Sequence, residues 1–318
     1  MREHLRNAWR GLRSQGAVPT LDRAWDFVRR RLCPRPVLNL DMSAVTLALP
    51  SPTGRPTASI VIPVYNNLAY TLDCLRSIAA SGDSTSCEVI VVDDASTDGT
   101  REALQDMPGL RYQRNEVNSG FIRTCNTGAA LARGHFLVLL NNDTVVQRGW
   151  LDSLLETFER YPDTGLAGSR LVYPDGSLQE AGCVIFADGR AGNYGRLDAA
   201  LDPRYCCVRE ADYCSGAAVA IPTELFSRLG GFDERYIPAY YEDADLAMRV
   251  RQAGLGVRYQ PHSWVVHLEG VTSGVSEEGG IKAYQRSNRF KFAERWAQEL
   301  RKFPPWGVSR DLAVKRGE

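Results

Sequence analysis

Oxygen-bearing side chains gather where apolar runs of this sequence end. Three such runs finish in Tyr65-Asn66, Asp93-Asp94 and Asn142-Asp143, and a later run finishes in His267. A further acidic pair, Glu242-Asp243, opens a helical pattern. Carboxylate and amide oxygens bind hard divalent cations, and a positioned carboxylate can accept a proton from a reacting group. These residue types therefore favour metal-assisted acid–base chemistry at strand ends.

Several other chemistries lack support in the sequence. No G-x-G-x-x-G follows the first apolar run, and the chain has neither a G-x-x-x-x-G-K-[ST] loop nor a G-x-S-x-G elbow. Dinucleotide dehydrogenases, P-loop enzymes and elbow-type serine hydrolases are therefore disfavoured. None of the eight cysteines has C-x-x-C spacing. This usage indicates a reduced, cytosolic chain with no disulfide framework and no zinc site.

Alternating strands and helices must position the polar strand ends. Strands are predicted over 58–64, 88–92, 110–114 and 135–140, and helices over 68–80, 98–107, 121–133 and 150–160. This alternation predicts an α/β fold in which helices cover both faces of a mostly parallel sheet. Ligands of such sheets bind at the carboxyl edge of the strands, so the polar strand ends are expected to meet there.

The second half of the chain is less regular. The pattern predicts a buried strand over 213–221, helices over 223–229 and 243–253, one or two strands over 256–267, and a long basic helix over 281–301. Thr223 is the expected N-cap of the helix that it begins. His267 would then lie at a strand end, and Asp243 in the first turn of a helix.

The ordered motifs of this chain resemble those of the inverting family 2 glycosyltransferases, which have the GT-A fold. The series is Ile62-Pro63-Val64-Tyr65-Asn66, Val92-Asp93-Asp94-Ala95-Ser96-Thr97-Asp98, Asn118-Ser119-Gly120-Phe121, Leu140-Asn141-Asn142-Asp143-Thr144, Gly231-Phe232-Asp233-Glu234, Tyr241-Glu242-Asp243-Ala244-Asp245-Leu246, and His267. The stretches 173–182 and 118–126 resemble the subset that builds bacterial O-antigens and rhamnose-containing polysaccharides. The resemblance implies a Rossmann-like GT-A domain over 57–302 and a nucleotide-sugar donor.

The resemblance assigns nucleotide binding to the first strand ends and the loop after the third strand. The residues are Pro63, Tyr65, Asn66, Asp93, Asp94, Asn118, Gly120, Arg123 and Asn142. Asp93 or Asp94 can accept a hydrogen bond from the N3–H of a pyrimidine base. The alternatives are that these aspartates cap the next helix, that Tyr65 packs in the core, and that Arg123 is a solvated surface residue rather than a phosphate ligand.

The family's metal-binding motif, usually Asp-x-Asp, falls on Asn141-Asn142-Asp143. Asp143 is the principal expected ligand, Asn141 replaces the first acid of the motif, and His267 is the second ligand that the resemblance implies. Both Mg²⁺ and Mn²⁺ suit oxygen ligands, and the histidine favours Mn²⁺. The alternative for His267 is a hydrogen-bonded histidine of the core.

The family's catalytic motif falls on the helix that Glu242 and Asp243 open. Asp243 is the expected general base, which removes the proton from the acceptor hydroxyl, and Glu242 assists it. Arg249 is expected to pair with the acidic residues of this motif. Contacts with the sugar and the acceptor are assigned to Ser215, Gly216, Ala217, Tyr241 and Asp245. The alternative is that the carboxylates of Glu242 and Asp243 only cap the helix and interact with its dipole.

Charge is distributed unevenly along the chain. Lys+Arg and Asp+Glu are both 38, yet residues 1–36 contain nine arginines and three acidic residues, so that 1–36 is +6 and 37–318 is −6. A globally basic nucleic-acid binder is disfavoured. Residues 1–36 are expected to form basic amphipathic helices, which either bind an anionic membrane surface or pack on the protein or a partner. Residues 37–56 are expected to be a linker and 303–318 a C-terminal tail.

These observations predict a cytoplasmic enzyme, peripheral on the inner face of the cytoplasmic membrane if 1–36 binds lipid. The expected reaction moves a sugar from a dTDP-rhamnose or UDP-hexose type donor to a lipid-linked glycan. No apolar run is long enough to span a bilayer. Two other classes are considered: a non-catalytic nucleotide- or glycan-binding member of a polysaccharide assembly complex, which Asn141 favours, and a nucleotidyltransferase.

Overall fold

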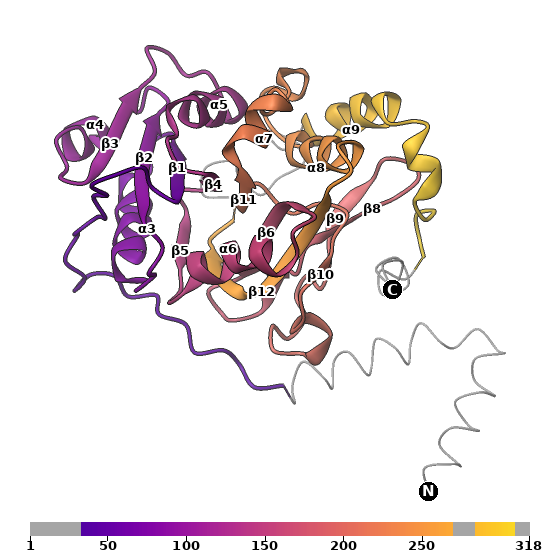
Figure 1. Ribbon diagram of the computed structural model, residues 1–318, viewed down its shortest axis with the longest axis horizontal. Helices are drawn as coiled ribbons and strands as arrows, with labels where there is room; N and C mark the ends of the chain where they lie inside the picture. Colours follow the sequence, from indigo (N-terminus) through magenta and orange to yellow (C-terminus); the bar gives the residue numbers. More distant parts are fainter. Residues whose placement is uncertain (1–32, 270–283, 309–318) are drawn as a thin grey trace, which may run out of the picture.

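The computed structural model describes residues 33–269 and 284–308. A ten-stranded sheet forms its centre, with the path β10-β12-β6-β11-β4-β1-β2-β3, on which β5 pairs with β12 and β7 with β6. A separate pair is formed by β8 and β9. The expected α/β fold is confirmed (Figure 1).

The parallel part of the sheet follows the predicted elements closely. It contains β1 (Ala58–Val64), β2 (Cys87–Asp93), β3 (Leu110–Arg114) and β4 (Phe136–Leu140), joined through α3 (Leu68–Ala80), α4 (Thr100–Leu104) and α5 (Phe121–Leu131). The helix predicted over 98–107 is shorter than expected. Gly99 is left-handed, at φ +84°, and Asp98 accepts hydrogen bonds from the Leu68 amide and the Thr100 hydroxyl instead of entering the helix.

The other half of the sheet is mixed. It contains β5 (Thr144–Val146), β6 (Thr164–Val172), β7 (Leu178–Glu180), β10 (Arg209–Glu210), β11 (Ala218–Pro222) and β12 (Gly256–His267). The sequence pattern missed β6, although all nine of its residues are buried. β11 lies antiparallel between β4 and β6, and begins only at Ala218 because the preceding residues form a turn. The strand predicted over 213–221 is therefore only partly correct.

Smaller elements complete the described part of the chain. They are α6 (Trp150–Arg160), β8 (Cys183–Ile185), β9 (Ala191–Asn193), η1 (Pro203–Tyr205), α7 (Thr223–Arg228), η2 (Glu234–Tyr236), α8 (Glu242–Gln252), α9 (Tyr284–Arg295) and η4 (Glu299–Lys302). The predicted cap at Thr223 is wrong, because its hydroxyl donates to the Gly134 carbonyl instead.

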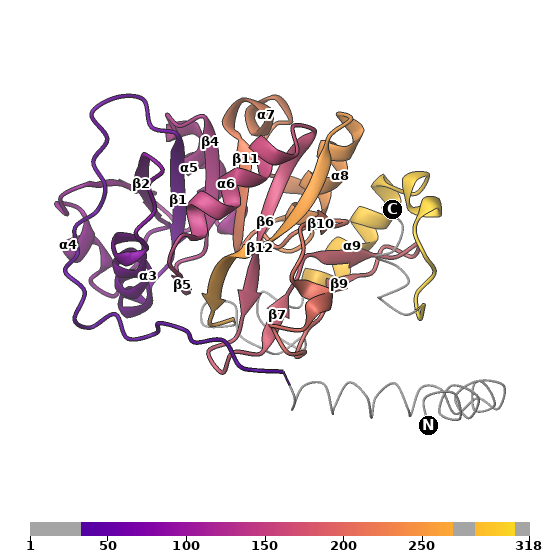
Figure 2. The same ribbon diagram turned by 60° about the horizontal axis from the view of Figure 1, so that its bottom comes forward.

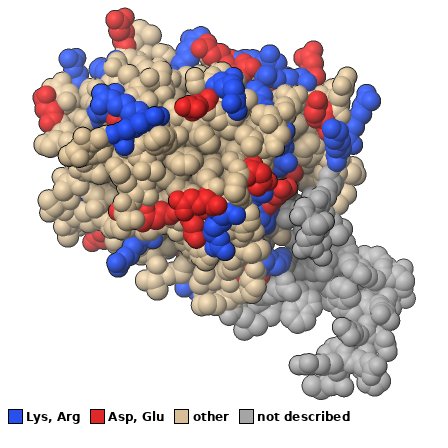
Figure 3. Space-filling model, in the orientation of Figure 1, with Lys and Arg blue, Asp and Glu red and all other residues tan. Residues whose placement is uncertain are grey.

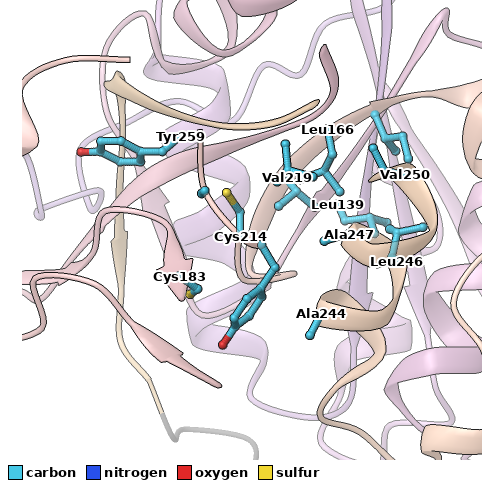
Figure 4. Packing of buried hydrophobic residues seen from close by; sticks show 14 of the residues in the cluster. Leu139, Leu166, Cys183, Cys214, Val219, Ala244, Leu246, Ala247, Val250 and Tyr259 are labelled. Carbon is cyan, nitrogen blue, oxygen red and sulfur yellow. The ribbon is translucent and has the colours of Figure 1, made fainter. Parts of the chain in front are cut away.

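Helices cover both faces of the sheet, as expected (Figures 1 and 2). On one face, residues such as Ile60 pack with Leu75 of α3 and Trp150 of α6. On the other face, Val61 lies in the same apolar cluster as residues of α5, α7, α8 and α9. Successive strand residues point to opposite faces, so the β-branched residues of one strand pack against the helices on both faces of the sheet. Figure 4 shows Leu246, Ala247 and Val250 of α8 beside Leu139, Leu166 and Val219 of the sheet, so this side of α8 packs on the sheet.

The predicted linker over 37–56 belongs to the domain rather than connecting to it. Its backbone is irregular, as expected, but Met42 and Leu49 are buried in the two apolar clusters. The start of the tail also packs, since the Pro304 carbonyl accepts a hydrogen bond from Ala187 and the ring of Trp306 meets Phe186 edge-on. The burial of these few apolar side chains holds both segments against the domain and opposes their detachment.

The helices predicted within 1–36 lie almost wholly outside the described residues, and their membrane or packing role stays a prediction. Within the described part of the chain, no helix is both long and apolar enough to cross a membrane. All eight cysteines fall in that part and none is paired. On the face shown in Figure 3, acidic and basic side chains are interspersed.

Candidate functional site

A cavity of about 570 Å³ lies at the carboxyl edge of β1 and β4, next to the start of α8. Most of the predicted site residues line it: Pro63, Tyr65, Asp94, Asn118, Gly120, Asn141, Asn142, Asp143, Ser215, Gly216, Ala217, Tyr241, Glu242, Asp243 and His267. They come from distant parts of the sequence, and the sheet brings them together. The polar strand ends therefore lie together at one edge of the sheet, as expected.

Only one of the two adjacent aspartates after β2 faces this cavity. Asp94 lines it, and its carboxylate accepts hydrogen bonds of 2.8 Å from the Asn115 side chain and from the amides of Ser119 and Gly120. Asp93 is fully buried and does not line the cavity. It accepts from the Ser96 amide, the Tyr112 hydroxyl and the Arg114 guanidinium.

Asp93 therefore has a structural role in this fold, and the prediction that it binds nucleotide is corrected. Burial tends to raise its pKa, but the hydrogen bonds from Ser96, Tyr112 and Arg114 outweigh burial and hold the pKa below its usual value. Successive residues at a strand end point to opposite sides, which explains why Asp93 and Asp94 differ.

Two other predicted nucleotide ligands lie outside the cavity lining. The Asn66 side chain accepts a hydrogen bond of 2.7 Å from the Thr97 amide, which connects the loops after β1 and β2. Arg123 is exposed and its guanidinium binds Glu234 at 2.8–2.9 Å. The structure therefore supports the alternative that Arg123 is a solvated surface residue rather than a phosphate ligand.

The loop after β3 keeps Asn118 and Gly120 at the cavity. Gly120 has φ +81°, a left-handed conformation that other residue types rarely adopt, and it precedes α5 directly. Its amide donates to Asp94 at 2.8 Å and to the Asn118 side chain at 3.2 Å. Tyr65 lines the cavity and has about 39% of its surface exposed, so it is not packed in the core.

The predicted metal ligands meet at one wall. His267 Nε2 lies 3.3 Å from Asp143 Oδ1, and both side chains are largely buried. The register of β12 on β5 produces this contact, because it pairs His267 with Thr144, and the Leu268 amide then donates to the Asp143 carbonyl. Asn142 lies beside them and its amide donates to the Thr71 hydroxyl at 3.0 Å.

These residues fit a divalent cation that takes part of its coordination from a ligand. Asn141 Oδ1 is buried and has no hydrogen-bond partner, so this amide oxygen is free to bind a cation at the same wall. Within residues 33–269 and 284–308, no group of three or more His, Cys, Asp and Glu side chains could hold a metal alone. Asp143, His267 and Asn141 would thus need additional oxygen ligands, such as phosphate and water.

The start of α8 brings a carboxylate to the same cavity. Asp243 Oδ1 accepts a hydrogen bond of 2.7 Å from the Ala244 amide, and Oδ2 accepts one of 3.3 Å from the Gly216 amide. Burial raises the pKa of Asp243. The pKa of the adjacent Glu242 is raised well above its usual value by burial and by Asp243, and its Oε2 has no partner.

Burial raises the pKa of both carboxylates, and the charge of Asp243 adds to the rise at Glu242, so the adjacent pair resists carrying two negative charges at once. Tyr240 and Tyr241, both left-handed at φ +75°, direct the chain into α8 so that these side chains reach the cavity. Tyr241 lines the cavity, but its hydroxyl donates to the Gly189 carbonyl at 3.1 Å.

Asp245 does not reach the cavity, and its predicted contact with sugar or acceptor is corrected. It is fully buried and accepts hydrogen bonds from Tyr236, Trp296 and Arg249. The expected pairing of Arg249 with an acid of this motif is confirmed at 2.7 Å from Asp245.

Sequence reasoning missed two residues of β7. Gln179 lines the cavity and Glu180 lies beneath it, where Glu180 Oε1 accepts a hydrogen bond of 2.9 Å from the Ser215 amide. Ser215 begins the turn that supplies the Gly216 amide to Asp243. The signal was available, since 173–182 belongs to the stretch whose resemblance was noted, but β7 has only three residues.

Glu180 gives the protein a pH-dependent stability. Burial raises its pKa from 4.5 to about 7, so the folded state holds a proton that the unfolded state has released. The stability that this proton provides is complete below about pH 4.5 and is lost as the pH rises to about 7, by about 3 kcal/mol. Relative to Glu180→Gln, the wild-type free energy of unfolding should therefore fall across this range. Urea titrations of both proteins at several pH values measure it, and a constant difference would contradict the buried proton.

Comparison with known proteins identifies relatives of this chain. The family model described as "Glycosyl transferase family 2" matches residues 59–201. "O-antigen biosynthesis protein RfbC" of Myxococcus xanthus is 30% identical over 68% of this chain and 18% of its own length. "N-acetylglucosaminyl-diphospho-decaprenol L-rhamnosyltransferase" of Mycobacterium tuberculosis is 27% identical over 71% of this chain and 81% of its own length. The chain also spans only 30% of a longer relative from Sinorhizobium fredii.

A solved structure shares the fold. The structure of GalNAc-T7 with UDP, GalNAc and Mn²⁺ aligns with a TM-score of 0.61 and 18% identity, over 79% of this chain and 50% of that chain. At this identity the similarity concerns the fold. It agrees with the strand and helix arrangement described above.

Proposed function

We propose, because this chain carries a glycosyl transferase family 2 domain over residues 59–201, that it is a metal-dependent inverting glycosyltransferase. The donor is a pyrimidine nucleotide sugar of the dTDP-rhamnose or UDP-hexose type. The acceptor is a hydroxyl of a lipid-linked bacterial surface glycan. One observation carries the proposal: a single cavity is lined by the Asp143–His267 pair and by Asp243.

The donor nucleotide is assigned to the end of the cavity formed by β1 and β2. Asp94 supplies an acceptor for the N3–H of the base, and Pro63 and Tyr65 offer apolar and aromatic surface beside it. Asn118 and Gly120 form the adjoining loop. Asp143, His267 and Asn141 would hold the cation, which when bound offsets the charge of the departing diphosphate.

Asp243 acts as the general base in a single displacement. Its carboxylate takes the proton of the acceptor hydroxyl as that oxygen forms a bond to the anomeric carbon. The bond between this carbon and the diphosphate oxygen breaks on the opposite side, and the nucleoside diphosphate leaves with the bonding electrons. The configuration at the anomeric carbon is inverted, and no covalent enzyme intermediate forms.

The surroundings of Asp243 suit this role. The Gly216 and Ala244 amides hold its carboxylate in place, and burial makes it a stronger base than a solvated aspartate. Burial and the charge of Asp243 raise the pKa of Glu242 well above its usual value, which opposes a second negative charge beside Asp243. Ser215, Gly216, Ala217 and Tyr241 form the surface nearest to Asp243 that the sugar and acceptor would contact.

The class of donor and acceptor is supported by the relatives. The M. tuberculosis protein is named for transfer of L-rhamnose to a decaprenol-linked sugar, and the M. xanthus protein for O-antigen biosynthesis. A lipid-linked acceptor implies work at a membrane surface. We propose that residues 1–36 hold the enzyme at the inner face of the cytoplasmic membrane, because their +6 charge would attract anionic lipid.

Metal removal and donor choice test the function together. We expect one pyrimidine nucleotide sugar, among UDP- and dTDP-sugars screened with Mn²⁺, to raise the melting temperature more than the others. The same sugar with an extract of lipid-linked glycan should yield a free nucleoside diphosphate. EDTA should abolish this release, and excess Mn²⁺ or Mg²⁺ should restore it.

Other outcomes of this screen separate the rival functions. Release of pyrophosphate from a sugar phosphate and a nucleoside triphosphate would indicate a nucleotidyltransferase. Donor binding without turnover on any extract would indicate the non-catalytic binding module that Asn141 favours. Turnover that EDTA leaves unchanged would contradict the metal assignment alone.

A further inference from the structure

Gln179 of β7 lies between His267 and the partly exposed ion pair of Glu269 and Arg196. Its Oε1 is 2.9 Å from His267 Nδ1, its Nε2 is 3.1 Å from Glu269 Oε2, and only 2% of the residue is exposed. None of the motifs that predicted the site includes Gln179. Its position at the cavity wall indicates that Gln179 has a role in the site.

The neighbours of Gln179 fix the orientation of its amide group. Glu269 Oε2 also accepts a hydrogen bond of 2.8 Å from the Tyr173 hydroxyl and binds Arg196 at 2.9 Å. A carboxylate in an ion pair only accepts hydrogen bonds, so the NH₂ group of Gln179 must face Glu269. The amide oxygen of Gln179 is then the atom that faces His267.

This orientation determines the tautomer of His267. An amide oxygen only accepts, so Nδ1 of the imidazole must carry the hydrogen that it donates. A ring that carries its hydrogen on Nδ1 presents the electron pair of Nε2 to a cation, and Nε2 is the atom 3.3 Å from Asp143 Oδ1 at the cavity wall. Two electron-pair donors side by side are what a divalent cation requires.

An irregularity in the sheet turns Gln179 toward His267. β7 pairs with β6 through Leu178 opposite Val172 and Glu180 opposite Leu171, so Gln179 is an extra residue with no partner across the ladder. Such bulges bend a strand locally and redirect the side chain of the extra residue, and they are frequent beside active sites. β7 thereby sends Gln179 to the metal wall while Glu180 supports the Ser215 turn.

We propose that Gln179 is the positioning residue of the metal site: it holds the His267 ring in the orientation and tautomer that present Nε2 to the cation. This inference rests on the proposed metal role of His267. Hydrogen bonds from a ligating histidine to an outer partner fix its ring and tautomer, and their loss lowers metal affinity about 10–100-fold. Gln179 acts only through His267, and this sets it apart from a residue that merely stabilises the fold.

The test measures Mn²⁺ affinity rather than turnover. Free Mn²⁺ is followed by electron paramagnetic resonance as it is titrated into the full-length protein with UDP or dTDP, against a protein-free blank. Gln179→Met keeps the length of the side chain and removes both hydrogen bonds, and should weaken Mn²⁺ binding about 10–100-fold. In a His267→Ala background, the same substitution should cause no further loss, because the residue through which it acts is gone.

A matched control excludes a general effect of losing an amide. The Gln147 side chain lies directly after β5 and, like that of Gln179, takes part in two hydrogen bonds. It accepts one from the backbone amide of Asn39 at 2.8 Å and donates one to the backbone carbonyl of Asn39 at 3.1 Å. Gln147→Met should leave Mn²⁺ affinity within about twofold of wild type. The melting temperatures of both variants report any shared loss of stability.

The outcomes separate this inference from the proposed function. Wild-type Mn²⁺ affinity in Gln179→Met, or an equal loss in the presence and absence of His267, would overturn the positioning role and leave the metal site intact. Failure of the wild-type protein to bind Mn²⁺ with either nucleotide would overturn the metal assignment and this inference together.

Discussion

Asp243→Asn is expected to lower the rate of sugar transfer by about 10²–10⁴-fold, the usual contribution of a positioned general base. The asparagine keeps the shape of the side chain and can still accept a hydrogen bond from the Gly216 amide, but it cannot take the acceptor proton. Donor affinity should change little, because the proposed nucleotide ligands lie at the β1–β2 end of the cavity. Steady-state rates and donor binding, measured on the same preparation, separate the two effects.

Glu242→Gln provides the matched comparison. Glu242 is adjacent and buried, and its pKa is raised well above its usual value, so the isosteric neutral replacement should cost far less than Asp243→Asn. If Asp243→Asn retained full transfer, the assignment of the base would be wrong. If Glu242→Gln were the more damaging variant, the roles of the two carboxylates would be reversed.

Asp245→Ala should destabilise the fold by about 3–5 kcal/mol, the usual cost of removing one partner from a buried ion pair. Asp245 has no exposed surface, and it binds Arg249 at 2.7 Å and Arg295 at 3.2 Å. It also accepts hydrogen bonds from Tyr236 and Trp296, so that it connects α8 to η2 and to the C-terminal helices. Alanine would leave the Arg249 guanidinium without its carboxylate, whereas Arg295 would keep its ion pair with Asp233.

Chemical denaturation of Asp245→Ala and of a surface control measures this cost. Asp163 pairs with Arg258 at 2.8 Å, but its side chain is 62% exposed, so Asp163→Ala should cost no more than about 1 kcal/mol. Similar losses for both variants would contradict the central position of Asp245. A variant of Asp245 that kept its stability but lost acceptor binding would restore the original prediction for this residue.

Asp243 and Asp245 show what a motif can and cannot predict. Both belong to the motif by which the family was identified, and both were assigned to the site. Two residues along a helix are turned by about 200°, so one of them faces the cavity and the other the core. The helical period could have separated their roles, but which face is the core depends on where α8 packs. That is set by the contacts of Leu246 and Val250 with the sheet.

The parallel half of the sheet was predicted well because its signals are local. β1, α3, β3 and α6 have the predicted bounds, since each is a clear apolar run or an amphipathic pattern between turn residues. β6 escaped prediction because its run, 164–172, includes Gly165, Gly168, Ser169 and Arg170, which do not read as a buried strand. Burial there depends on neighbours that are distant in sequence.

Much of the cavity lining was predicted, but residues that act through others were not. Gln179 lies in the noted stretch 173–182, but its role was missed because it follows from a bulge in β7 and from contacts with His267 and Glu269. Asp93 was assigned to nucleotide binding because the motif contains two aspartates, and only the direction of each side chain separates them. Motifs identify the residue types of a site, whereas tertiary contacts decide which of them face it.

The stereochemistry of the transferred sugar tests the central claim most directly. The donor selected in the binding screen is incubated with Mn²⁺ and lipid-linked acceptor, and the anomeric configuration of the product is determined by nuclear magnetic resonance. A single displacement with Asp243 as base predicts a configuration opposite to that of the donor, with loss of the product in Asp243→Asn. A product with the donor's own configuration would contradict the mechanism, as would inverted product formed at the wild-type rate by Asp243→Asn.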